Sequence, residues 1–418
     1  MSTEDREPRT ENLRRPSVLR SPSAVLCLLS AVLCLLSAGC AALSSPFRRP
    51  PPRPGRTTLG APLVTLPAQS LGNCLIVEAK WDRGGPYHFL VDTGSSVTLV
   101  TPTLAKRYAA KDAPPPDAPR VRVASADGGF TELPATTIQR LDFGDLRFDD
   151  VPVLIYDCAP LTAHFGLKID GVLGFPLFRE TRLTLDYPRT RVIVQRANST
   201  ALTPGSTVPL DDASKTPLIR VRLGDRTLVA LIDSGSDAPF SLNPVGIDPE
   251  FAVAPRAGAT VSTLTGDRPQ QVGRLAETLV LGRYELPRPI VELTDELSTI
   301  GGGILKNFTV TFDQQRDRVT FHRDSREPIP APPRRSAGVS FTRTPAYWRV
   351  ASVIPGSPAD QARMEPGDLV TRVNGEHVAK WDLRRYDQLV ATAREITCTL
   401  LYGSTEAPTT FATFELVP

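Results

Sequence analysis

The chain has 418 residues, more than one hydrophobic core usually holds, so its length predicts two or three domains with connecting segments. Its formal net charge is +3, from 48 lysines and arginines against 45 acidic residues, and this balance gives no indication of nucleic-acid binding. The 41 prolines and the scarcity of helical patterns favour β-rich domains joined by stiff linkers.

The sequence lacks the familiar motifs of phosphate-binding loops and of zinc sites. The sequence contains neither a GxxxxGK loop nor an HExxH motif. The scattered positions of its four histidines indicate structural or surface roles for His88, His164, His322 and His377. We therefore expect neither a cofactor nor a bound metal ion.

The amino-terminal segment has the layout of a secretion signal, with arginines before an apolar stretch over 24–42. Its small residues just before Cys40 resemble the bacterial lipobox, in which the cysteine is lipidated and becomes the mature first residue. Residues 1–40 are thus a predicted lipoprotein signal peptide. Two alternatives are an uncleaved anchor of the ~20 residues that span a bilayer and ordinary cleavage near Ala42. The long polar lead suggests a start near Val18.

All three alternatives place the rest of the chain outside the cytoplasm. We expect a bacterial cell-envelope protein that is lipid-anchored to the membrane and faces the periplasm. Residues 41–62 form a predicted proline-rich linker, because the prolines in 45–55 favour an extended polyproline spacer. Its arginines would either contact anionic lipid or wall polymer, or simply be solvated.

A triplet of Asp, Ser or Thr, and Gly occurs twice, as 92–94 and 233–235, and each copy ends an apolar run. The sequence after the triplets also repeats, because 141–157 aligns without gaps on 279–295, and 172–186 on 299–313. The chain therefore contains a duplicated lobe, predicted at 63–200 and 201–325. Short strand patterns between Gly, Pro and Asp turns dominate both copies.

The duplicated lobes resemble the aspartic peptidases, and more the retropepsin branch than the pepsin branch. The resemblance implies that Asp92 and Asp233 are the catalytic pair, and that Gly174 and Gly301 lie in segments that brace the two turns. It also implies polypeptide substrates and a catalytic monomer, because one chain supplies both halves of the site. The alternative is that Asp92 and Asp233 only cap turns in a β-rich binding protein.

Each residue of the triplets has a physical role in this interpretation. Two carboxylates about 3 Å apart cannot both ionise, so they share a proton and activate a water. Glycine at the third position lets the backbone turn tightly. The other predicted supporting residues are Thr93, Gly94, Ser95, Ser234, Gly235 and Ser236. In the family the hydroxyls of Thr93 and Ser234 bond across the axis, and those of Ser95 and Ser236 would donate to the carboxylates and favour a mildly acidic optimum.

Two Gly-containing turns are candidate flaps above the pair. The first tip comprises Asp127, Gly128 and Gly129, and the second comprises Thr265 and Gly266. Ordinary turns are the alternative. Cys74 and Cys158 would either form a disulfide in an oxidising compartment or remain buried thiols, whereas Cys398 lies on an apolar strand pattern typical of a core.

A second proline-rich linker is predicted at 326–337, followed by a separate module at 338–418. The module resembles a bacterial PDZ domain. This resemblance implies that the loop of Gly338, Val339, Ser340 and Phe341 offers backbone N–H groups to a peptide C-terminus, beside a strand edge. Arg363 stands where the family usually has glycine after a short helix, which costs on the order of 1 kcal/mol in a left-handed conformation.

The predicted fold is therefore mainly β, with two pseudo-twofold-related aspartic-peptidase β lobes followed by a small α+β PDZ domain. The predicted function is an aspartic endopeptidase whose PDZ module binds peptides or substrate tails. A non-catalytic envelope scaffold that binds peptides is the alternative, and cleavage of the chain by itself is a third possibility.

Overall fold

The computed structural model describes residues 55–111, 120–124, 129–199, 203–211, 213, 215–262 and 267–418. The predicted signal peptide with Cys40, most of the first linker, and the flap residues Asp127, Gly128, Thr265 and Gly266 lie outside these residues. In the described ranges, no helix combines the length and apolar character needed to cross a bilayer.

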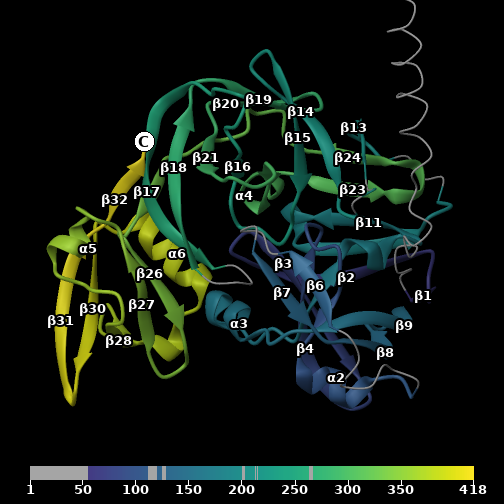
Figure 1. The fold of residues 1–418 in the computed structure, drawn as a ribbon, viewed down its shortest axis with the longest axis horizontal. Coiled ribbons are helices and arrows are strands. Elements are labelled where there is room, and N and C mark those ends of the chain that lie inside the picture. The colour runs from purple at the N-terminus through teal and green to yellow at the C-terminus, as the bar shows by residue number, and fades with distance from the viewer. Residues whose placement is uncertain are drawn as a thin grey trace, which may run out of the picture. The chain divides into compact units, whose positions relative to one another are not determined.

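The first copy of the repeat folds into a β lobe (Figure 1). Its elements are β1 (Arg56–Leu59), β2 (Leu63–Leu71), β3 (Cys74–Trp81), β4 (Gly84–Asp92), β5 (Leu99–Val100), α2 (Pro102–Tyr108), β6 (Val121–Ala124), β7 (Phe130–Leu133), β8 (Ala135–Asp142), β9 (Leu146–Ile155), α3 (Ala159–Phe165), β10 (Gly171–Gly174), η1 (Phe175–Phe178), β11 (Thr181–Asp186), η2 (Tyr187–Arg189) and β12 (Arg191–Arg196). β1 was expected to be linker, but it pairs with β9 and places Leu59 against the core.

The second copy repeats much of the strand order of the first, without counterparts of α2 and α3 among the described residues. Its elements are β13 (Ser206–Pro209), β14 (Leu218–Leu223), β15 (Arg226–Ile232), β16 (Phe240–Leu242), β17 (Phe251–Ser262), β18 (Asp267–Leu275), β19 (Thr278–Leu281), β20 (Tyr284–Pro287), β21 (Ile290–Leu293), β22 (Thr299–Ile300), α4 (Gly302–Leu305), β23 (Thr309–Asp313), η3 (Gln314–Arg316) and β24 (Arg318–His322). In each lobe the strand that leads into the Asp triplet pairs in parallel with the predicted brace, β4 with β10 and β15 with β22. This pairing brings each brace beside its turn.

The backbone conformation repeats at the positions that the sequence alignment equates. Gly144 and Gly282 have φ of 76° and 60°. Thr190 lies four residues after Asp186 and has φ of 49°. Asp317 lies four residues after the aligned Asp313 and has φ of 47°. Left-handed residues mark the turns of a chain, so their coincidence confirms the gapless alignment of the two copies.

The two lobes share a sheet and a core. β11 and β23 pair antiparallel, which joins β12 of the first lobe to β24 of the second in one continuous order. One hydrophobic cluster extends across both lobes, and Phe175 and Phe312 meet edge to face at 5.3 Å between ring centroids. The lobes therefore form one folded body around their common sheet.

The final segment forms a separate small sheet with its own core. Its elements are β25 (Arg334–Ser336), β26 (Val339–Arg343), β27 (Trp348–Val353), α5 (Pro358–Gln361), β28 (Leu369–Val373), β29 (Glu376–His377), η4 (Val378–Lys380), α6 (Leu383–Thr392), β30 (Glu395–Tyr402), β31 (Thr405–Ala412) and β32 (Phe414–Val417). Phe341 and Trp348 pack with Tyr386 of α6 at its centre. Arg363 follows α5 with φ of 61°, so the expected left-handed residue is present without glycine.

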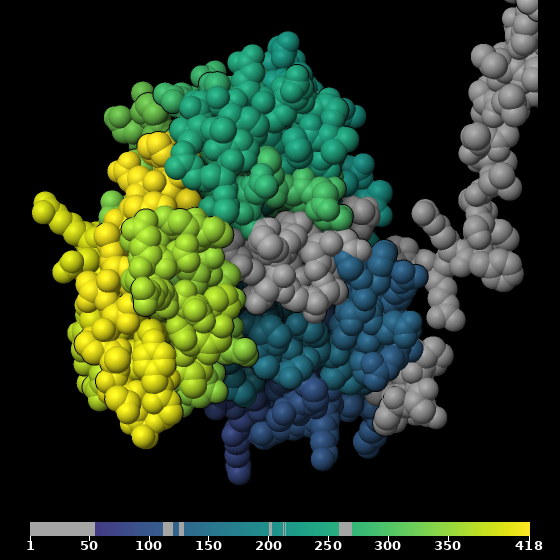
Figure 2. Space-filling view, turned by 60° about the vertical axis from the view of Figure 1, so that its left-hand side comes forward, coloured from purple at the N-terminus to yellow at the C-terminus, as the bar shows by residue number. Residues whose placement is uncertain are grey.

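This segment contacts the lobes at several places, and its last strand and the preceding linker form one of them. Leu416 and Val417 pack against Val272 of β18, and Arg274 in the same strand donates hydrogen bonds to the carbonyls of Ala331, Pro332 and Pro418. Figure 2 shows the yellow carboxyl-terminal surface meeting the teal surface of the second lobe. The part of the linker at 334–336 is not extended coil, because β25 pairs with β32.

Candidate active site

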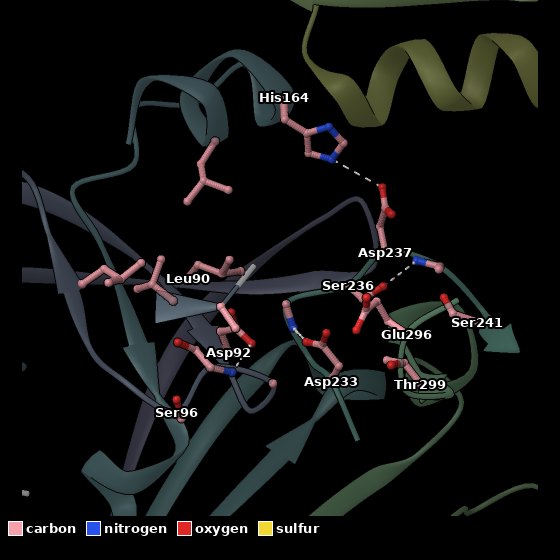
Figure 3. A pocket seen from close by; sticks show the side chains of 18 of the residues that line it. Leu90, Asp92, Ser96, His164, Asp233, Ser236, Asp237, Ser241, Glu296 and Thr299 are labelled. Carbon is pink, nitrogen blue, oxygen red and sulfur yellow. Dashed lines mark hydrogen bonds and ion pairs between the residues drawn. The ribbon is translucent and has the colours of Figure 1, made fainter. Parts of the chain in front are cut away.

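The two Asp triplets meet between the lobes. Asp92 ends β4, and Asp233 directly follows β15. Their carboxyl groups share a side-chain hydrogen bond, and Figure 3 shows them side by side. Residues 141 positions apart in the sequence thus place two acidic groups at one point.

Hydrogen bonds between the lobes lock the two turns together. The Thr93 hydroxyl donates to the carbonyl of Ile232 at 2.7 Å, and the Ser234 hydroxyl donates to the carbonyl of Val91 at 2.7 Å. Each hydroxyl also accepts the backbone N–H of the other residue at 3.0 Å. Thr93 and Ser234 are buried, so this reciprocal set is protected from competition with water. The cross-lobe bonds that the family resemblance implied are present.

The glycines of the turns are required by close approach. A Cβ on Gly94 would overlap the carboxyl group of Asp233, and a Cβ on Gly235 would overlap that of Asp92. Neither glycine is among the residues with positive φ. Glycine is therefore needed at both positions, but not for the tight backbone turn that the sequence suggested. It is needed because the opposite carboxyl group leaves no room for a side chain.

Backbone groups, and not the Ser95 hydroxyl, donate to the carboxyl groups. The N–H of Ser95 donates to Asp92 at 3.1 Å, while the Ser95 hydroxyl donates to the carbonyl of Val97 at 2.7 Å. The N–H of Gly235 donates to Asp233 at 2.8 Å. The hydroxyl of Ser236 accepts the N–H of Ala238 at 3.3 Å. The prediction for the Ser95 hydroxyl is wrong, since its short loop offers a nearer acceptor.

The braces hold the turns from below. The N–H of Phe175, next to Gly174, donates to the carbonyl of Ser95 at 2.9 Å, and the N–H of Gly302, next to Gly301, donates to the carbonyl of Ser236 at 2.7 Å. A Cβ on Gly174 would overlap the carbonyl of Val97, and one on Gly301 would overlap that of Ala238. Glycine at both positions lets the brace and the turn approach closely.

Burial dominates the electrostatics of the pair. It raises the pKa of Asp92 well above its ordinary value, and the charge of Asp233 and the hydrogen bond between them raise it further. Burial also raises the pKa of Asp233, but backbone donors and the hydrogen bond from Asp92 oppose this rise. Burial and the charge between the two groups therefore favour a state in which the pair holds one shared proton.

A pocket lined by both lobes opens above the pair. Apolar side chains from the first lobe and acidic ones from the second line it, with Leu90, Leu161, Phe165 and Val172 in the former group and Asp237, Glu292 and Glu296 in the latter. Val123 and Ala124 of β6 and Gln270 of β18 also line it. The two hairpins that carry the predicted flap tips thus border the pocket, although the tips themselves, apart from Gly129, lie outside the described residues.

Two pocket residues were missed by sequence reasoning. His164 of α3 faces Asp237 of the second lobe at 3.3 Å (Figure 3). Although burial raises the pKa of Asp237, the hydrogen bond and charge of His164 lower it overall. Asp237 follows the second triplet closely and could have been suspected from that position. His164, which the sequence suggested was structural or at the surface, carries no local signal for its place.

The other predicted site residues have clear positions. Gly338 precedes β26 with φ of 77°, and its N–H donates to the hydroxyl of Ser336 at 2.9 Å, while Val339, Ser340 and Phe341 lie in β26. Cys74, Cys158 and Cys398 are free and buried, so the alternative of buried thiols holds. Among the described residues, no group of three His, Cys, Asp or Glu side chains is placed to hold a metal ion.

Comparisons with known families give the same two parts. Residues 77–177 match the family model described as aspartyl protease, and residues 349–401 match that described as PDZ domain. The chain contains an aspartyl protease domain and a PDZ domain. The first match includes Asp92 and Gly174. Both family resemblances seen in the sequence are confirmed, as is the mainly β fold of the aspartyl protease lobes with their PDZ domain.

Further comparisons add context for the aspartyl protease domain. No curated protein is significantly similar to the chain in sequence. Among solved structures, the basic 7S globulin from soybean is similar with 14% identity and a TM-score of 0.35, over 62% of this chain and 94% of that chain.

Proposed function

We propose that this protein is an aspartic endopeptidase in which Asp92 and Asp233 are the catalytic pair. One observation carries the proposal: two acidic side chains, supplied by equivalent turns of separate lobes, share a hydrogen bond at the floor of a pocket. Carboxyl groups that only capped turns would not need to converge. The chemistry that such a pair performs is general acid–base catalysis of hydrolysis by water.

We assign the role of base to Asp233 and that of acid to Asp92, because Asp233 receives more backbone donors, which favour an ionised carboxylate. Asp233, which receives the N–H of Gly235 at 2.8 Å and the proton of Asp92, is the base that removes a proton from the attacking water. The hydroxide oxygen bonds to the amide carbon while Asp92 donates its proton to the developing oxyanion. Collapse of the tetrahedral intermediate breaks the C–N bond, and the proton held by Asp233 passes to the departing nitrogen. As the C=O bond re-forms, the hydroxyl that received the proton of Asp92 returns it to Asp92, so the cycle ends with Asp92 protonated and Asp233 ionised as before.

The substrates are polypeptides, and the PDZ domain binds peptide C-termini along β26. The protein works as a catalytic monomer, since both triplets belong to one chain. It is exported and lipid-anchored through Cys40 in a bacterial envelope, a proposal supported by the amino-terminal sequence pattern alone.

The test is hydrolysis of an unfolded protein by the full chain at pH 4 to 6. Asp92→Asn and Asp233→Asn should each lower kcat/KM by about a thousandfold, because each removes half of an acid–base pair. Asp225→Asn is the matched control, since that side chain is 96% exposed and does not line the pocket. Equal degradation by wild type and Asp92→Asn would refute the proposal.

Two other outcomes separate the alternatives. Peptide binding without hydrolysis by any preparation would favour a non-catalytic scaffold. Cleavage of the chain itself, in a fraction that does not depend on protein concentration, would show that the activity is intramolecular only. Each of these results would replace the endopeptidase proposal.

A further inference from the structure

The PDZ domain contacts the protease lobes at the residues that line the pocket. Arg343, the last residue of β26, donates a hydrogen bond from Nη1 to the carbonyl of His164 at 3.1 Å. Arg334 of β25 pairs with Glu292 of β21, another pocket residue. The contact surface therefore reaches the cleft itself.

The contact at Arg343 is built from several elements. Helix α3 ends at Phe165, so the carbonyl of His164 belongs to its last turn, where carbonyls lack partners within the helix and carry partial negative charge. The Arg343 side chain also lies over the rings of Trp348 and Tyr386, at 5.1 and 5.6 Å from their centroids. Two aromatic rings of the PDZ core thus hold the guanidinium group against the helix end.

A second contact fixes the same helix end from the other side. Leu383, the first residue of α6, is buried in a cluster of the first lobe that includes Phe165 and Cys74. A Cβ built on Gly166, the left-handed residue after α3, would come within 4.0 Å of Arg343 and Asp382. The end of α3 therefore lies between β26 and the start of α6.

The carboxyl-terminal end of α3 lies next to the loop that follows the second Asp triplet. The His164 side chain faces Asp237 at 3.3 Å, and Asp237 is two residues from Gly235, whose N–H donates to Asp233. Asp237 and His164 are 42% and 33% exposed, so their pair lies at the open side of the pocket, within reach of a substrate. A chain of contacts runs from the PDZ domain through His164 to the second triplet.

We propose that Arg343 is a positioning residue through which the PDZ domain sets the His164–Asp237 pair that borders the substrate cleft. The proposal rests on the proposed endopeptidase function. Arg343 touches neither the carboxyl pair nor their protons, so it acts on how an extended polypeptide is held and not on the chemical step. The PDZ domain is then part of the substrate-binding apparatus of the protease.

The test compares three variants of the full chain on an unfolded polypeptide. Arg343→Ala should raise KM about fivefold or more with kcat little changed, the size of a modest coupling between sites. Arg343→Lys should restore most of the wild-type KM, because an ammonium group can still donate to a helix-end carbonyl. Arg349→Ala is the matched control, since Arg349 is an exposed arginine of the neighbouring strand β27. An unchanged KM in Arg343→Ala, or an equal rise in Arg349→Ala, would overturn the proposal.

A double-mutant cycle tests the route. Asp237→Asn should raise KM by itself, and adding Arg343→Ala should raise it by much less than the product of the single effects, because both act through His164. Effects that multiply independently would contradict a common route.

Hydrogen exchange gives a readout that does not need activity. Peptides that cover 159–166 and 235–238 should exchange faster in Arg343→Ala than in wild type or Arg349→Ala. If wild type hydrolyses nothing, the endopeptidase proposal fails, and this comparison alone decides the coupling. Unchanged exchange in both segments would refute the coupling even in an active enzyme.

Discussion

The two carboxyl groups of the proposed catalytic pair have unequal neighbours although their turns are related by duplication. Asp92 accepts the N–H groups of Gly94 and Ser95, and its pKa is raised by burial and by the charge of Asp233. Asp233 accepts those of Gly235, Ser236 and Gly94 in addition to the proton of Asp92. The two groups differ in the additional backbone donor at Asp233, which favours the ionised form of that carboxyl group.

This asymmetry predicts a bell-shaped dependence of kcat/KM on pH. Hydrolysis needs Asp233 ionised, so the rate is lost as pH falls through its pKa, and it needs Asp92 protonated, so the rate is lost as pH rises through the raised pKa of Asp92. The alkaline limb should therefore lie above the pKa of an exposed aspartic acid, which is about 3.9. Steady-state kinetics between pH 3 and 9 would measure both limbs, with unfolding followed at each pH as a control. A profile that is flat up to pH 8 would contradict the assignment.

At the scale of elements, each triplet depends on a short brace whose glycine cannot be replaced by a residue with a side chain. Gly174 of β10 lies against the carbonyls of Val97 and Ser95. An added Cβ there meets backbone, which cannot rotate away as a flexible side chain would. Glycine at 174 is therefore a packing requirement of the turn that follows Asp92.

Gly174→Ala should destabilise the protein by about 2 kcal/mol or more and lower activity, because the β10 strand must move away from the first triplet. Gly246→Ala is a useful comparison. Gly246 has φ of 76° but has open space around it, so alanine there costs only the left-handed strain of about 1 kcal/mol. Urea unfolding of both variants would measure the difference. Equal loss in the two would mean that steric overlap at the brace is unimportant.

The elements also show what the sequence could and could not predict. The duplicated segments were aligned correctly because glycine turns and apolar strands repeat at fixed spacing, as Gly144 and Gly282 do. The pairing of His164 with Asp237 was not predictable, because it depends on how α3 of one lobe faces a loop of the other. β1 was not predictable because a short edge strand with a single apolar residue has no core pattern of its own.

At the scale of the whole molecule, the duplicated lobes are joined by a repeated arginine and aspartate arrangement. Asp186 accepts from Arg189 and Arg191 in its own lobe, and Thr309 of the other lobe donates to it at 3.0 Å. The equivalent Asp313 accepts from the neighbouring arginines at 316 and 318, and from Arg182 of the first lobe at 3.4 Å. Each lobe thus ends a strand of the shared sheet with a carboxylate that also binds its partner.

Asp313→Asn should lower the stability of both lobes together. Arg182 is only 3% exposed, so replacing the carboxylate of Asp313 removes one charged partner from a buried cation, which should cost about 3 kcal/mol. Because β11 and β23 pair within one core, we expect a single unfolding transition at lower urea concentration for residues on both sides. Asp317→Asn is the matched control, since Asp317 is exposed and its φ of 47° is one that asparagine tolerates. Hydrogen exchange in urea would follow each lobe separately. If β23 lost protection while β11 kept it, the lobes would be independent units, and the shared sheet would be a contact between them and not the centre of one fold.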